Sequence, residues 1–327
     1  MTPSIEYVDG AAFAPDAALL LNDCFPKPSI DYSPEYIAWQ LSFPGPTPPI
    51  AAAAFCGREP VGFVGASPRR LRLGPEEADG FLASFWCVRP GRSDATGTIL
   101  LLDSLLERLW ERNAPVLAFG FPQGVGERLF PTCFRRAGFL HVNLAPLPGF
   151  GFRADTSGQL QSDWRVALPS FPALLPELVA QSATADTSIV HICPSPAQLA
   201  HYASDPRSRR LVVATNRKTG ERAAAWAVRT VVRTASGLLR VPSLDSVLAQ
   251  RRSAGPLPAL LLATSRLWPP SPDQPATVNA PSLAGFDANA LRALGIRQCG
   301  GGFLAHLFLP PSLAHWRQAT ATAAEVV

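Results

Sequence analysis

Apolar and polar residues alternate along the first half of the chain with two different periods. A period of two is typical of half-buried strands, and a period of about 3.6 is typical of amphipathic helices. The two periods follow each other in the order strand, strand, helix, strand, helix, strand. These elements are predicted at residues 60–73, 80–90, 96–112, 114–121, 126–139 and 141–147. We expect Pro131 to break the second helix, because proline removes a backbone N–H from a helix interior.

The second half of the chain repeats this order of elements. The pattern predicts a hairpin, a strand, a helix, a strand, a helix and a strand at residues 210–232, 236–248, 256–268, 276–283, 287–296 and 302–309. The tripeptide Arg-Leu-Trp at 108–110 also recurs at 266–268. Such echoes in the same order indicate an internal duplication, and a period this long predicts two domains rather than a solenoid.

The duplication divides the chain into three parts. We expect a first domain at residues 1–155 and a second, more diverged domain at residues 188–327. Residues 156–187 are expected to form a linker with a short helix near 172–181. The length of 327 residues agrees with two domains, because a domain usually contains about 100 to 200 residues.

Composition and charge exclude several classes of protein. Hydrophobic residues make up 47% of the chain and charged residues 17%, which predicts a globular rather than a disordered protein. The net charge of +4 favours an anionic ligand but is too small to indicate nucleic acid. The six cysteines show no CxxC pair and no zinc spacing, so we expect buried thiols and no metal site. Because no signal-peptide pattern and no long apolar run occurs, we expect a cytoplasmic protein with no membrane partner.

The junction between the second strand and the first helix carries the candidate binding chemistry. Residues 89–98 are rich in Arg, Gly, Ser and Thr, and the apolar part of a helix follows at Ile99. The first N–H groups of a helix have no partner within the helix and form the positive end of its dipole, so they can bind a pyrophosphate. Gly97 leaves room for such an anion, because glycine has no Cβ.

Four segments of the first half contain the motifs of one known family in the same order. They are YIAWQLSFPGP at 36–46, GREPVGFVGASPRR at 57–70, FWCVRPGRSDATGTILLLDSLL at 85–106 and FRRAGF at 134–139. With them, most of residues 4–150 resembles the GNAT superfamily of N-acyltransferases. The second half resembles a more diverged copy, through HYASDPRSRRLVVAT at 201–215 and RRSAGPLPALL at 251–261. The resemblance implies an α/β fold with tandem GNAT-like domains, each a mixed, mainly antiparallel sheet flanked by helices.

The resemblance also implies an acyl-CoA donor, such as acetyl-CoA. In the family, the strand before the turn contacts the pantetheine arm and the thioester, and the turn holds the pyrophosphate. The residues at these positions are Trp86, Cys87 and Val88 for the arm, Arg92, Ser93, Ala95, Thr96, Gly97 and Thr98 for the phosphates, and Arg252, Gly255 and Asn279 in the second copy. The chain departs from the family pattern at Asp94, where a base or an amide is expected, and at Pro256, which removes one N–H donor from the second copy.

Acyl transfer to an amine needs a group that accepts the ammonium proton. The tyrosine that often protonates the leaving thiolate in the family is replaced by Phe134 and Leu291 in the two copies. The candidate catalytic residues are the bases Asp245 and His141 and the nucleophile Cys87, with Glu127 and His201 as further bases. Each candidate has a structural alternative, such as an ion pair for Asp245 or a place in the core for Cys87, whose thiol would need a lowered pKa to react.

These observations predict an acyltransferase that moves an acetyl or other acyl group from a CoA thioester to an amine of a small-molecule acceptor. The second domain is expected to shape the acceptor site, which we place between the domains. One alternative is a GNAT fold that uses an acyl carrier protein or aminoacyl-tRNA as its donor, or that performs another biosynthetic reaction. A non-catalytic binding module is a further alternative, and the modest charge argues against a nucleic-acid partner.

Overall fold

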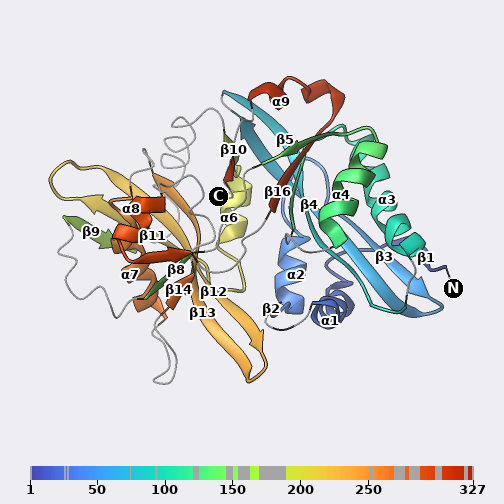
Figure 1. Ribbon diagram of the computed structural model, residues 1–327, viewed down its shortest axis with the longest axis horizontal. Coiled ribbons are helices and arrows are strands. Elements are labelled where there is room, and N and C mark those ends of the chain that lie inside the picture. Colours follow the sequence, from blue (N-terminus) through green and yellow to red (C-terminus); the bar gives the residue numbers. More distant parts are fainter. Residues whose placement is uncertain are drawn as a thin grey trace.

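The computed structural model describes residues 2–25, 27, 29–73, 75–92, 95–120, 125–144, 150–153, 163–168, 189–249, 254–268, 277–279, 288–298, 304–319 and 323–325. Two mainly antiparallel sheets form two halves that lie side by side, and helices flank both sheets (Figure 1). The predicted α/β class with two similar sheets is therefore confirmed.

The first sheet has the strand order β1-β3-β4-β5-β6-β16-β7, while β10 pairs with the end of β4 and β17 pairs with β10. Its strands are β1 (Ser4–Tyr7), β3 (Ile50–Cys56), β4 (Glu59–Leu73), β5 (Glu76–Val88), β6 (Val116–Gly120), β7 (Leu140–Asn143), β10 (Ile189–Ile192), β16 (Leu304–Leu309) and β17 (Ala323–Glu325). Two helices, α3 (Ala95–Glu111) and α4 (Val125–Arg136), pack on one face of this sheet. The helices α1 (Ala14–Cys24) and α2 (Pro34–Gln40) pack on the opposite face, so the sheet separates two cores.

The second sheet has the order β15-β8-β14-β13-β12-β11-β9, and β2 pairs with β12. Its strands are β2 (Ser29–Ile30), β8 (Phe150–Arg153), β9 (Trp164–Ala167), β11 (Arg210–Asn216), β12 (Arg222–Thr234), β13 (Gly237–Ala249), β14 (Thr277–Asn279) and β15 (Ile296–Gln298). The remaining helices are α6 (Pro196–Tyr202), α7 (Leu257–Leu267), α8 (Ala288–Ala293), a 3-10 turn at Pro311–Leu313 and α9 (Trp316–Ala319). Part of the predicted linker is thus strand β9, and the helix predicted at 172–181 lies outside the described residues.

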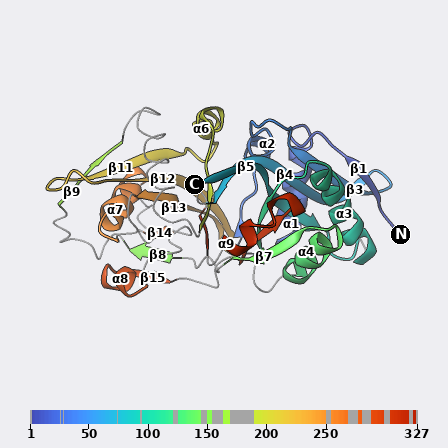
Figure 2. The same cartoon turned by 90° about the horizontal axis from the view of Figure 1, so that it is seen from above.

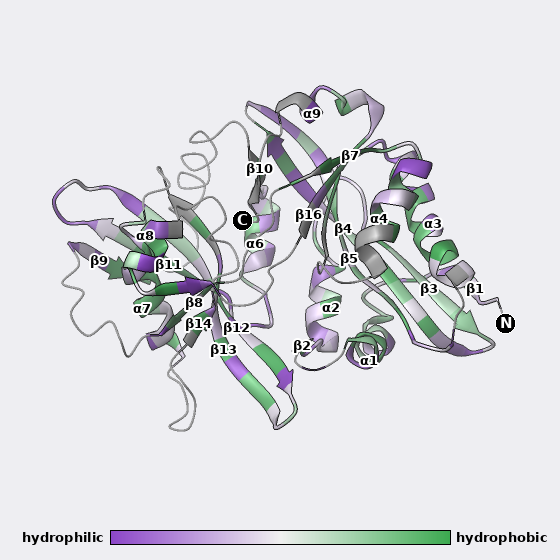
Figure 3. Ribbon diagram, in the orientation of Figure 1, coloured by the Kyte–Doolittle hydropathy of each residue, from purple (hydrophilic) through white to green (hydrophobic). Residues whose placement is uncertain are grey.

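Helix α3 shows why the pattern of apolar positions predicts these elements well. Its leucines Leu101, Leu102, Leu105 and Leu109 are completely buried against the first sheet. Polar residues share the helix with them and face outward, as an amphipathic helix requires (Figure 3).

Helix α4 is continuous although Pro131 was expected to break it. The missing N–H and the clash of the proline ring cost about 3 kcal/mol in a helix interior. Phe134 and Cys133 of the same helix are buried in the core, and Phe130 packs against it. Burial of such a side chain contributes about 1.5 to 3 kcal/mol, so packing outweighs the loss at Pro131.

Each sheet contains, in its interior, a strand from the other half of the chain. Strand β16, near the end of the chain, lies between β6 and β7, where Leu307 pairs with Leu117 and Val142. Strand β8 lies between β14 and β15, where Phe152 pairs with Val278 and Ile296. The sequence pattern assigned residues 302–309 to the second set of elements, and that assignment is wrong. A strand's alternation shows which side chains are buried but not which sheet it joins.

The halves also pair with each other in a reciprocal way. Strand β2, which precedes α2, joins the second sheet, and strand β10, which precedes α6, joins the first. Both helices start with a serine followed by a proline, and the Ser33 and Ser195 hydroxyls accept hydrogen bonds from the N–H groups of Tyr36 and Gln198. Seen from above, α2 and α6 lie near the boundary of the halves (Figure 2). The equivalent order of elements supports the predicted duplication.

Candidate functional site

Strands β5 and β6 are parallel neighbours that part at a bulge. Among the described residues, they are paired only where residues 81–83 face residues 116–118. Beyond this point the register between β4 and β5 shifts, and Phe85 has a φ of 62°, in the left-handed region. A bulge bends its strand and increases the local twist, so the end of β5 diverges from β6. The result is an opening between two adjacent strands of the sheet.

The same geometry occurs in the second sheet. Among the described residues, β13 and β14 are paired only at Ser243 and Asn279. The register between β12 and β13 shifts next to Asp245, which has no partner residue in the strand ladder. Asp245 therefore occupies the bulge position that Phe85 occupies in the first sheet. Asn279, predicted to bind the cofactor, lies on the strand beside this second opening.

Two polar side-chain atoms of β5 are buried at the first opening without a hydrogen-bond partner. They are the Ser84 hydroxyl and the indole N–H of Trp86. The Trp86 ring packs edge-on against Phe130 of α4, with ring centres 4.9 Å apart. A buried donor without a partner costs about 1 to 3 kcal/mol, so such groups are expected where a ligand completes the hydrogen bonding. Of the two, Trp86 lies on the α3 and α4 side of β5, where its indole N–H can donate to the carbonyl of a ligand.

The start of α3 lies directly after β5 and its turn. Ser93 and Asp94 lie outside the described residues, so the repulsion expected from Asp94 is not tested. Gly97 is buried in the first turn of the helix, Thr98 is half-buried and Thr96 is exposed. The first turn of α3 thus combines backbone N–H groups with a residue that has no side chain.

The two arginines near this turn differ in how much charge they can offer an anion. Arg89 forms ion pairs with Glu59 at 2.6 Å and with Asp23 at 3.0 Å, which neutralise it. Arg92 is 59% exposed and lies 3.8 Å from Glu59. Arg92 is therefore the better placed of the two to attract a phosphate.

Cys87 lies on the other side of β5 from Trp86. It is buried in the core beneath α1, whereas Trp86 packs on the α3 and α4 side. A hydrogen bond with Cys24 and burial raise the pKa of the Cys87 thiol well above its ordinary value. A reactive thiol needs the opposite shift, so these contacts favour the core alternative for Cys87.

His141 is paired with a residue that the sequence did not suggest. Its Nε2 lies 3.1 Å from Nδ1 of His306, and its ring stacks on Phe308. Phe308 in turn stacks on Phe134, which stands where the family often has a tyrosine. His141 is on β7 and His306 is on the exchanged strand β16, so only the strand exchange brings them together. No motif or spacing in the sequence signals this pair.

Burial, followed by the charges of His306, Arg135 and Arg317, lowers the pKa of His141 to about 4. The unfolded chain then binds more protons than the folded chain between about pH 4 and pH 6.5. We expect the free energy of unfolding to fall as the pH drops below 6.5, by about 1 kcal/mol between pH 7 and pH 5 after allowance for partial exposure. Urea unfolding of His141→Gln should show a shallower pH dependence, with His315→Gln as the control. Parallel pH profiles of the parent and His141→Gln would contradict this.

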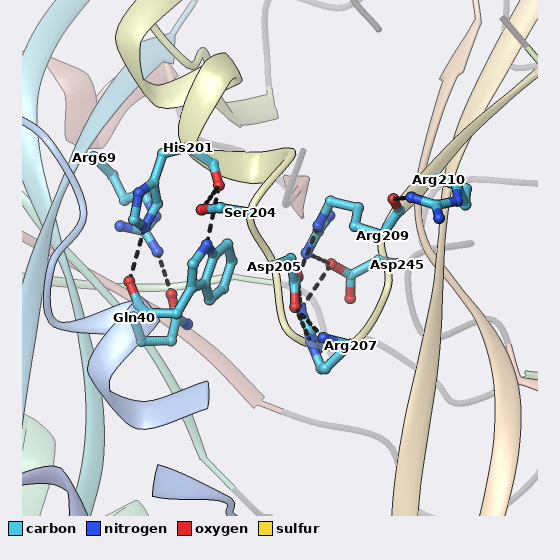
Figure 4. A network of polar contacts seen from close by, with 10 residues as sticks. Gln40, Arg69, His201, Ser204, Asp205, Arg207, Arg209, Arg210 and Asp245 are labelled. Carbon is cyan, nitrogen blue, oxygen red and sulfur yellow. Dashed lines mark hydrogen bonds and ion pairs between the residues drawn. The ribbon is translucent and has the colours of Figure 1, made fainter. Parts of the chain in front are cut away.

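Asp245 belongs to a network of charged residues at the boundary of the halves (Figure 4). Arg209 donates to Asp245 at 2.5 Å and to Asp205 at 2.9 Å, and Arg207 donates to Asp205 at 2.8 Å. Burial alone raises the pKa of Asp205, but Arg207 and Arg209 outweigh it and hold that pKa below its ordinary value. Asp245 thus has the ion-pair contacts of its structural alternative.

His201, a further candidate base, stacks on Trp39 across the boundary of the halves. The rings are nearly parallel, with centres 5.3 Å apart. The Trp39 indole donates to the His201 carbonyl at 3.0 Å, and Nε2 of His201 donates to the Trp39 carbonyl at 2.8 Å (Figure 4). This reciprocal pair gives His201 a structural role in joining α2 and α6.

The remaining predicted residues are less informative. Arg252 lies outside the described residues, as does the side chain of Glu127. Gly255 is exposed in the turn before α7, and Pro256 caps that helix without a side-chain hydrogen bond. The structure thus brings Trp86, the start of α3 and the histidine pair to one face of the first sheet, while Asp245 lies at the opening of the second.

The described residues contain neither a candidate metal site nor a helix that could span a membrane. Within them, no three His, Cys, Asp or Glu side chains gather closely enough to hold a metal ion. None of the helices in this part of the chain has both the length and the apolar content needed to cross a bilayer.

Comparison with known proteins identifies the fold. No family model and no curated protein matches the sequence. Among solved structures, N-myristoyltransferase of Saccharomyces cerevisiae with bound myristoyl-CoA is 12% identical, with a TM-score of 0.63 over 94% of this chain and 83% of that one. A tandem GNAT protein from the clavulanic acid biosynthesis pathway is 14% identical, with a TM-score of 0.59 over 93% and 98% of the two chains. A putative acetyltransferase from Pyrococcus horikoshii is 13% identical, with a TM-score of 0.60 over 95% and 90%. The chain therefore has the tandem GNAT fold.

Proposed function

We propose that the protein is an N-acyltransferase that moves an acyl group from a CoA thioester to an amine of a small-molecule acceptor. The observation that carries this proposal is the opening between β5 and β6. It lies next to the first turn of α3, and the indole N–H of Trp86 on this side of β5 is buried with no hydrogen-bond partner among the described residues. The fold is that of acyltransferases that include a protein solved with bound myristoyl-CoA.

The residues around the opening can hold both ends of such a donor. The N–H groups of the first turn of α3 would bind the pyrophosphate, and Gly97 would let it approach the backbone. Arg92 would add an exposed positive charge, and the indole N–H of Trp86 would hydrogen-bond the thioester carbonyl. When bound, acyl-CoA supplies a carbonyl open to attack by an amine, with a thiolate as the leaving group.

We assign the proton transfer to the pair of His141 and His306. Both imidazoles lie on the face of the sheet that holds Phe134, the position of the missing tyrosine. The lowered pKa keeps the His141 ring neutral at pH 7, as a proton acceptor must be, while a pKa of about 4 makes it a weaker base than an ordinary imidazole. In His141→Gln and His306→Gln, kcat should fall while the Kd for CoA stays unchanged.

Calorimetric titration with CoA, acetyl-CoA and longer acyl-CoAs tests the donor site directly. We expect saturable binding to the parent protein and at least about tenfold weaker binding to Gly97→Glu, because the new carboxylate repels the phosphates. Gly97→Gln is the matched control that adds the same bulk without the charge, and it should bind more tightly than Gly97→Glu.

Equal CoA affinity of the parent and Gly97→Glu would contradict this binding site. Saturable binding of an acyl carrier protein, with no binding of CoA, would instead support the carrier-dependent alternative. Urea unfolding of each variant shows whether a loss of binding reflects a loss of folding.

A further inference from the structure

A cavity of about 190 Å³ lies where the two halves meet. Its walls come from β2 and the start of α2 on one side, and from residues 206–208, β12 and β13 on the other. The charged and polar side chains that line the cavity include those of Asp31, Tyr36, Arg207, Ser208, Arg229 and Arg240. Neither half forms this cavity alone.

The cavity carries an excess of positive charge. Within the described part of the chain, the side chains of Arg229 and Arg240 form no ion pair or hydrogen bond, whereas Arg207 is paired with Asp205. Asp31 is the only acidic side chain among the described lining residues, and it already lies 3.9 Å from Arg233. Two guanidinium groups are therefore available to an anion, and guanidinium binds carboxylate and phosphate through two parallel hydrogen bonds.

The cationic wall is held in place by buried contacts. Asp205, whose side chain is fully buried, accepts from both the backbone and the guanidinium of Arg207. The turn continues into Ser208, whose φ of 59° is unfavourable for serine and persists only because the surroundings enforce it. The backbone N–H of Arg229 donates to the Arg207 carbonyl at 2.9 Å. The backbone of this wall is therefore fixed before a ligand binds, and binding has only to order the side chains of Arg229 and Arg240.

Tyr36 connects the cavity with the opening between β5 and β6. The Arg207 guanidinium lies over the Tyr36 ring at 4.6 Å, and the same ring meets Phe85 edge-on at 6.0 Å. Phe85 is the bulge residue of β5 and directly precedes Trp86. The Tyr36 ring therefore lies between the cavity and β5, on the side of the strand away from α3 and α4, and the described lining of the cavity includes no residue of β5.

We propose that this cavity binds an oxyanion, a carboxylate or a phosphate, of the acceptor substrate through Arg229 and Arg240. The acceptor is then a small molecule that carries both an amine and an anionic group. That the anion belongs to an acceptor substrate rests on the proposed acyltransferase function. Binding of an anion in this cavity does not depend on CoA.

Titration with malonate and with inorganic phosphate, in the absence of CoA, tests the proposal. We expect saturable binding that weakens by about tenfold or more in Arg229→Gln and in Arg240→Gln, and that weakens further as salt is added. The matched control is Arg222→Gln, which removes the same charge from an exposed position at the far end of β12, and its affinity should equal that of the parent. Urea unfolding of the three variants checks that each is folded.

The outcomes separate the two proposals. Tighter binding of malonate indicates a carboxylate acceptor, and tighter binding of phosphate indicates a phosphate ester; both support the site. Equal affinities in the parent and the two cavity variants, or no saturable binding of either probe, overturn it. If the anion site holds while CoA fails to bind, the donor assignment is wrong and the cavity stands.

Discussion

Phe308→Ala is expected to lower the free energy of unfolding by about 3 to 5 kcal/mol, and to do so through the sheet of the opposite half. Phe308 is completely buried between β6 and β7, and its ring stacks on Phe134 at 3.7 Å. Removal of the ring leaves a cavity in the core under α3 and α4. Amide hydrogen exchange should therefore lose protection most strongly in β6 and β7, although the substitution lies near the end of the chain.

Phe152→Ala is the reciprocal test of the strand exchange. Phe152 belongs to the N-terminal half of the chain but is buried in the second sheet, beside Val278 and Ile296. We expect a similar loss of stability, with protection lost first in β14 and β15. If each substitution instead affected the sheet of its own half of the chain, the exchange of β8 and β16 would be wrong.

Asp205→Ala is expected to cost about 3 kcal/mol, because it removes the fully buried carboxylate that Arg207 and Arg209 share and leaves them only Asp245 as an acidic partner. The Asp205 carboxylate is fully buried and accepts from both Arg207 and Arg209. Asp163→Ala is the matched control, since it breaks an exposed ion pair with Lys218 at 3.0 Å. Such surface pairs contribute about 0 to 1 kcal/mol. Urea unfolding at pH 7 compares the two variants.

The contribution of Asp205 should also depend on pH. Because the folded protein holds the pKa of Asp205 below its ordinary value, the stabilisation is complete above that ordinary value of about 3.9. It is lost as the pH falls through the lower pKa of the folded state. Asp205→Asn should therefore lose less stability on acidification than the parent.

Equal stability of Asp205→Ala and Asp163→Ala at pH 7 would show that the buried network does not stabilise the fold.

Much of the local structure could be predicted because it depends on neighbours in the chain. The leucine spacing of α3 places one face in the core wherever the helix packs, and the Gly-rich stretch before it predicts a turn that leads into a helix. The repeated order of elements predicted two similar sheets, since each copy carries the same alternation. The break predicted at Pro131 is wrong because the stabilisation from burying the neighbouring side chains depends on the sheet that α4 packs against, which the local sequence does not show.

The contacts between distant segments were set by the three-dimensional fold. The alternation of residues 302–309 specifies which side chains of the strand are buried. Because the strand can form the same backbone hydrogen bonds in either sheet, the alternation does not specify which sheet it joins. That choice depends on the packing of Phe308 against Phe134 and its neighbours. His306 meets His141 only through that choice. The cavity with Arg229 and Arg240 likewise arises only where the two halves meet, because its walls come from segments that share no sequence pattern.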